Sequence, residues 1–100
     1  MNMIDLVKKE VNKISLDNEV ILFGSRARGD FRKDSDWDFL ILLKKKEVSK
    51  SEKEKIRERL YDLELATDEV ISTIIHSQNE WENRSVTPIY KIIKEEGKRA

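Results

Sequence analysis

The chain of 100 residues has no cysteine, one proline, three glycines and one histidine. Without cysteine there is no disulfide, no thiol nucleophile and no thiolate metal ligand. Neither sign of charge is in excess, since 20 lysines and arginines are balanced by 20 aspartates and glutamates. This balance gives no indication of nucleic-acid binding, and we do not expect nucleic acid as a partner.

Long apolar stretches are missing as well. The longest, from Phe39 to Leu43, is far below the roughly 20 residues that a membrane span needs, so no membrane partner is expected. The N-terminal MNMIDLVKKEV has neither the apolar region nor the small-residue cleavage site of a secretory signal. We therefore expect a cytoplasmic protein with one domain over residues 1–100.

Apolar periodicity, β-propensity and capping signals predict seven elements in the order α-β-β-α-β-α-α. Helices are expected over about 3–15, after Ser49, after Ser77 and from Thr87 to near Gly97, and strands over 19–23, 35–43 and 70–75. The first two strands are expected to be antiparallel, and the long helix suits a right-handed parallel crossover to the third. The predicted fold class is α/β (α+β), a small mixed β-sheet with helices packed mainly on one face.

Two of the three glycines lie in the connection between the first two strands, which reads GSRARGDFRKDSDWDF from Gly24 to Phe39. Gly24 allows the backbone to leave the strand sharply, and free amides of the turn form an anion cradle with the Ser25 hydroxyl. Arg28 lies three residues further on and is expected to reach a β- or γ-phosphate. Gly29 allows the turn to close with its backbone near the ligand.

Two aspartates open the second strand. Because side chains alternate along a strand, Asp36 and Asp38 are expected on one face, about 7 Å apart, with Trp37 on the other. Two carboxylates so close either raise one pKa or bind a cation, and carboxylates with neighbouring phosphates are typical ligands of Mg²⁺. These aspartates would also suit an ordinary turn, but together with the glycine turn they favour a site for a nucleoside triphosphate with Mg²⁺.

The same residues carry a family resemblance. Gly24-Ser25, Gly29 and Asp36-x-Asp38 match the signature G-S-x-x-x-G-(six)-D-x-D of the nucleotidyltransferase superfamily, which includes polymerase beta and kanamycin nucleotidyltransferase. The chain resembles its shortest branch, the minimal nucleotidyltransferases often paired with HEPN-domain toxins. The resemblance is specific over Gly24–Leu43 and extends loosely over the rest of the chain.

The resemblance implies an enzyme that moves a nucleoside monophosphate, AMP in our interpretation, from the triphosphate to a hydroxyl and releases pyrophosphate. It implies that Asp36 and Asp38 are the catalytic carboxylates that hold Mg²⁺. Gly24 and Ser25 would then hold the phosphates and Arg28 would contact the triphosphate, with ATP as the expected nucleotide.

The third carboxylate of the superfamily is expected on the third strand, which reads VISTII and contains no acid. Asp68 and Glu69 lie at its entrance, and Ser72 lies in its middle. Asp68 is our candidate for the third catalytic carboxylate, with Glu69, or a degenerate site with no third acid, as the alternatives.

The resemblance also implies a partner. The expected acceptor is a hydroxyl on a HEPN-like helical protein, and the chain would act as the antitoxin of a toxin–antitoxin pair. The alternative is a catalytically weak or inactive module that neutralises this partner by contact. Leu40 and Leu42 motivate that alternative, because they are expected to need a partner or a homo-oligomer to cover them. Arg26 is expected at the surface, outside the site.

Overall fold

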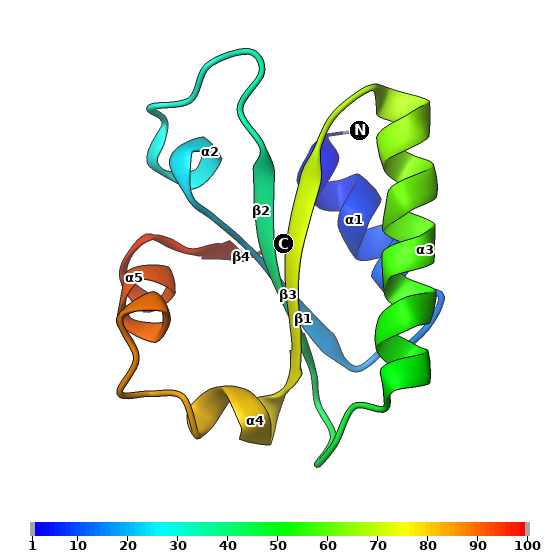
Figure 1. The fold of residues 1–100 in the computed structure, drawn as a ribbon, viewed down its shortest axis with the longest axis vertical. Helices are drawn as coiled ribbons and strands as arrows, with labels where there is room; N and C mark the ends of the chain where they lie inside the picture. The colour runs from blue at the N-terminus through cyan, green and yellow to red at the C-terminus, as the bar shows by residue number, and fades with distance from the viewer. Residues whose placement is uncertain (1, 100) are drawn as a thin grey trace.

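The computed structural model describes residues 2–99, in which a four-stranded sheet is packed between helices (Figure 1). In chain order the elements are α1 (Met3–Asn12), β1 (Asn18–Phe23), α2 (Ser25–Arg28), β2 (Trp37–Leu43), α3 (Lys50–Thr67), β3 (Ile71–Ser77), α4 (Gln78–Glu82), α5 (Pro88–Glu96) and β4 (Lys98–Arg99). All seven predicted elements are present, and α2 and β4 are additional. The mixed sheet and the fold class are confirmed.

The strands lie in the order β3-β2-β1-β4. β1 and β2 are antiparallel, with Phe23 opposite Asp38 at the end that carries the glycine turn. β2 and β3 are parallel and are joined through α3, with Asp38 beside Ser72. Both pairings were predicted, and they place the start of β2 at the end of the sheet where β1 stops and β3 begins.

One face of the sheet packs against α1 and α3. The alternate side chains Phe39, Ile41 and Leu43 of β2 are completely buried there, together with apolar residues of both helices. Trp37 packs at the margin of this core. The sequence predicted this apolar face from the alternation of β2.

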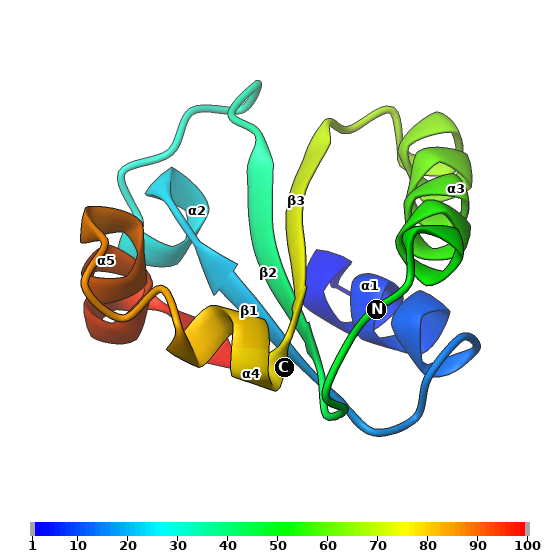
Figure 2. The same cartoon turned by 60° about the horizontal axis from the view of Figure 1, so that its bottom comes forward.

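The other face packs against α4 and α5, as Figures 1 and 2 show from two directions. Leu40 is fully buried and Leu42 is 4% exposed, because Trp81 of α4 and Ile93 of α5 cover them. The helices are therefore shared between both faces, so the expectation that they pack mainly on one face is wrong. The expectation that Leu40 and Leu42 need a partner is wrong for the same reason. An amphipathic helix reveals which of its own sides is buried, but not which face of a sheet it will cover.

Hydrogen bonds at the helix ends explain why two of the elements begin where they do. Ser49 with Glu52 and Ser77 with Glu80 form the two predicted capping boxes, so α3 and α4 begin at the residues that follow. Among the helices of residues 2–99, none is both long and apolar enough to cross a membrane.

Candidate active site

The connection after β1 is a single helical turn, α2, with a glycine at each end. Gly24 is its N-cap at φ 78° and ψ −161°, a backbone conformation restricted almost entirely to glycine. Gly29 follows α2 at φ 88° and donates its N–H to the Ser25 carbonyl at 2.9 Å. The predicted glycine-dependent turn is confirmed.

This turn lies directly against the carboxylate of Asp38. Phe23 and Asp38 are paired across β1 and β2, so Gly24 follows the pair immediately. A Cβ atom on Gly24 would overlap Asp38 Oδ2, which means that the carboxylate fills the space a side chain would need. The predicted phosphate-binding turn and the predicted metal-binding strand therefore meet at one place.

Asp36 and Asp38, the acid pair, differ in their surroundings. β2 begins at Trp37, so Asp36 is the last residue of the loop and is exposed, whereas Asp38 is half-buried within the strand. Burial raises the pKa of the Asp38 carboxyl, the negative charge of Asp36 raises this pKa further, and Arg28 opposes both. The acid pair therefore interacts electrostatically, and a bound cation would relieve the repulsion.

Among the residues that the structure describes, no third carboxylate joins the acid pair. Ser72 is the β3 residue in register with Asp38. Asp68 is the exposed C-cap of α3 with φ 57°, and Glu69 lies 3.8 Å from Arg26 Nη2. Over residues 2–99, no group of three acidic or histidine side chains is placed to share a metal ion. The role of Asp68 stays a prediction.

Arg26 organises the loop that leads into β2. The prediction that Arg26 lies at the surface is wrong. Its side chain is only 8% exposed, and its guanidinium lies 4.4 Å from the ring centres of both Phe31 and Trp37. Arg26 Nη2 donates to the carbonyls of Lys33 and Ser35, each at 3.1 Å. The Ser35 carbonyl immediately precedes Asp36, so Arg26 fixes the backbone that delivers the first carboxylate. The aromatic residues Phe31 and Trp37 in and next to this polar loop were the sequence feature that could have indicated the burial of Arg26.

Arg28 lies beside the acid pair, but it is held by two other carboxylates. Its Nε donates to Asp30 Oδ2 at 3.2 Å, and its Nη1 donates to Glu96 Oε2 at 3.2 Å. These contacts raise the pKa of Arg28 above its ordinary value. Glu96 also accepts a hydrogen bond from the Gly24 N–H at 3.0 Å. Sequence spacing gave no signal for Glu96, which is 72 residues from Gly24 along the chain.

A family model described as the nucleotidyltransferase domain matches residues 4–99. The chain belongs to this nucleotidyltransferase family. A protein of Methanocaldococcus jannaschii named "Putative protein adenylyltransferase MJ0141" is 41% identical over 83 residues, which cover 78% of this chain and 83% of that protein. A crystal structure described as "the toxin-antitoxin with AMP-PNP" superimposes with a TM-score of 0.68 at 18% identity, over 98% of this chain and 72% of that one. This last similarity concerns the fold alone.

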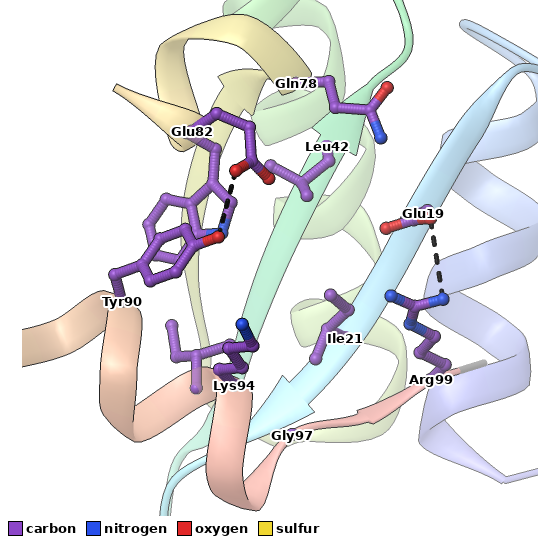
Figure 3. Close-up of a pocket in the computed structure, with 11 residues that line it drawn as sticks. Glu19, Ile21, Leu42, Gln78, Glu82, Tyr90, Lys94, Gly97 and Arg99 are labelled. Carbon is purple, nitrogen blue, oxygen red and sulfur yellow. Dashed lines mark hydrogen bonds and ion pairs between the residues drawn. The ribbon is translucent and has the colours of Figure 1, made fainter. Parts of the chain in front are cut away.

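A separate hollow of about 420 Å³ lies on the face of this nucleotidyltransferase that α4 and α5 cover (Figure 3). Its apolar lining includes Leu42 and Trp81, and at its rim the Tyr90 hydroxyl donates to Glu82 Oε2 at 3.1 Å. Glu19, also in the lining, pairs with Leu42 in the sheet register, four residue pairs from the Phe23–Asp38 pair. The hollow is therefore distinct from the glycine turn and the acid pair.

Proposed function

We propose that this nucleotidyltransferase transfers AMP from ATP to a hydroxyl group of a partner protein and releases pyrophosphate. Membership in the family supports the reaction class, and the printed name of the 41% identical relative supports a protein as the acceptor. The observation that carries the proposal is the contact of the Gly24 turn with the Asp38 carboxylate. The phosphates of an ATP molecule bound at this turn would lie next to the acid pair.

In this proposal Gly24, Ser25 and Arg28 hold the phosphates, and Asp36 and Asp38 hold Mg²⁺. The Gly24 N–H is bonded to Glu96, so Gly24 contributes by bringing the backbone of the turn close to the phosphates. The donor set fits the ion, because Mg²⁺ is typically bound through one or two carboxylates together with substrate phosphates. Burial and the negative charge of Asp36 both raise the pKa of Asp38, and this repulsion within the acid pair is the electrostatic property expected of a cation site. When bound, Mg²⁺ neutralises phosphate charge and polarises the phosphoryl group that is transferred.

The chemistry requires one bond to form and one to break. The acceptor oxygen bonds to the α-phosphorus while the bond from that phosphorus to the α,β-bridging oxygen breaks, and the hydroxyl proton passes to a nearby base or to water. The residues of this chain hold the reacting groups in place: Arg28 binds the leaving pyrophosphate and Arg26 keeps the backbone before Asp36 fixed. We propose Asp68 as the third catalytic carboxylate, since it is exposed and lies just before β3, whose first residues pair with the start of β2.

Radiolabelled ATP tests the proposal directly. Wild-type protein is incubated with Mg²⁺ and a protein extract of its source cell, using ATP labelled at either the α- or the γ-phosphate. We expect protein-bound label from α-labelled ATP only, and its loss in Asp38→Asn. Asp34→Asn, in the same exposed loop, is the matched control and should retain transfer. Equal transfer by Asp38→Asn, or label from γ-labelled ATP alone, would contradict the proposal.

We also propose that the partner is a HEPN-like helical toxin and that the chain acts as its antitoxin. The toxin–antitoxin description of the structure with the same fold supports this pairing. The alternative, neutralisation by contact alone, loses its motivation from Leu40 and Leu42, which are buried. Co-expression with the product of the adjacent gene separates the two: if Asp38→Asn neutralises that protein as well as the wild type does, contact is sufficient.

A further inference from the structure

Glu96, the last residue of α5, joins two parts of the proposed phosphate site. Its Oε1 accepts hydrogen bonds from the Gly24 N–H at 3.0 Å and from Arg28 Nη1 at 3.3 Å. Its Oε2 accepts a second bond from Arg28 Nη1 at 3.2 Å. The Glu96 side chain is 17% exposed, against 46% for Arg28. A largely buried carboxylate therefore holds both the backbone of the turn and the guanidinium beside it.

The fold fixes this carboxylate through the sheet. β4 pairs with β1 in antiparallel register, Leu22 opposite Lys98 and Ile21 opposite Arg99. Two residues beyond the last of these pairs the chain reaches Gly24 on one side and Glu96, the end of α5, on the other, and there the Gly24 N–H donates to the Glu96 side chain and not to a strand carbonyl. Gly97 permits the close approach, because a Cβ there would overlap both the Ile93 carbonyl and the Ile21 side chain.

The contacts of Arg28 leave part of its guanidinium available. Nε is bonded to Asp30 and Nη1 to Glu96, whereas no protein partner of Nη2 is found in the part of the chain that the structure describes. Charge-assisted hydrogen bonds from two sides restrict a planar guanidinium to one orientation. Glu96 and Asp30 thus set the orientation of Arg28 Nη2 before a nucleotide binds.

We propose that Glu96 is a positioning residue of the nucleotide site, which holds the Gly24 peptide and the Arg28 guanidinium in the arrangement that receives the phosphates of ATP. This inference rests on the proposed function. Glu96 acts through Arg28 and the turn and need not touch the nucleotide. Its own negative charge opposes the phosphates, so its contribution is orientation rather than attraction.

Two substitutions separate the effect of the Glu96 hydrogen-bond acceptor from the effect of its charge. Glu96→Gln retains an oxygen that can accept from both Gly24 and Arg28, but removes the charge. Glu96→Ala removes the acceptor as well. Glu95→Ala, at the exposed neighbouring position on α5, is the control for a general effect on the helix.

Glycine-selective ¹⁵N labelling tests the contact without any assumption about activity. The chain has three glycines, so the amide spectrum contains three glycine signals. We expect the Gly24 signal to move strongly in Glu96→Ala, less in Glu96→Gln and not in Glu95→Ala. A Gly24 signal that stays in place in a folded Glu96→Ala protein overturns the contact.

Kinetics test the role. In the AMP-transfer assay we expect Glu96→Ala to lower kcat/KM for Mg-ATP at least about tenfold, and Glu96→Gln to restore it to within about threefold of wild type. In an Arg28→Ala background Glu96→Ala should cost less than it does in the wild type, because only the positioning of the Gly24 peptide is left to lose. If Glu96→Gln is as impaired as Glu96→Ala, or the losses are fully additive, the positioning role is wrong although the proposed function stands. If the wild type binds no Mg-ATP, the proposed function fails and this role fails with it.

Discussion

The two glycines that flank α2 allow a matched test of how the turn and the acid pair depend on each other. At Gly29, with φ 88°, an added Cβ meets no atom within 4 Å, so Gly29→Ala introduces backbone strain alone. We expect it to lower the free energy of unfolding by about 1–2 kcal/mol. At Gly24, the strain is about 1–3 kcal/mol, and the Cβ would also overlap Asp38 Oδ2. Gly24→Ala must therefore displace either the turn or the carboxylate.

Urea denaturation and the AMP-transfer assay measure the two consequences separately. For a domain of this size each 1 kcal/mol lowers Tm by about 4–8 °C, so both variants should remain folded at 25 °C if the wild type has ordinary stability. We expect transfer to fall at least about tenfold more in Gly24→Ala than in Gly29→Ala, because only the first forces the turn and the proposed metal ligand Asp38 apart. Similar stability and similar transfer in the two variants would refute the contact between Gly24 and Asp38 as the basis of the site.

Three further predictions concern the acids and the loop. Arg26→Lys keeps the charge but loses the planar group between two rings, so we expect about 2 kcal/mol lower stability in urea denaturation and reduced transfer. Because burial and the charge of Asp36 raise the pKa of Asp38, its ionised form destabilises the fold, and this cost disappears as the pH falls below the ordinary aspartate range near about 4. Asp38→Asn should therefore raise Tm at pH 7 and not at pH 3, and a fall in Tm at pH 7 would contradict this reasoning. Asp68→Asn should lower transfer at least about tenfold without changing Tm, since asparagine tolerates the left-handed C-cap; unchanged transfer would leave a site with two carboxylates.

Local patterns predicted much of the fold and the central part of the site. Alternation along β2 predicted which side of the strand is core, with Phe39 and Ile41 buried on one face. The capping box at Ser49 predicted where α3 begins. Gly24 was recognisable because a sharp exit from a strand requires a residue without a side chain. Each of these inferences uses residues that are neighbours in the sequence or on one element.

The remaining features depend on contacts between distant parts of the chain. Nothing in the amphipathic pattern of α5 indicates that Ile93 covers the Leu40 face of the sheet. Nothing in the spacing of charges indicates that Glu96 meets Gly24, since the contact is created by the pairing of β4 with β1. Arg26 resembled a solvated cation because its burial depends on how Phe31 and Trp37 close around it.

β2 has a hydrogen-bonded strand along each of its edges. In contrast, β3 is an edge strand, and β4 pairs with only two residues of β1. Any fluctuation that frees the backbone of β2 must break two ladders at once, so amide exchange should be slowest in the middle of this strand. Asp36 lies outside the strand, and the backbone just before it is held by Arg26. One member of the acid pair is thus anchored by strand pairing on both sides, while the other depends on a loop that a single arginine holds.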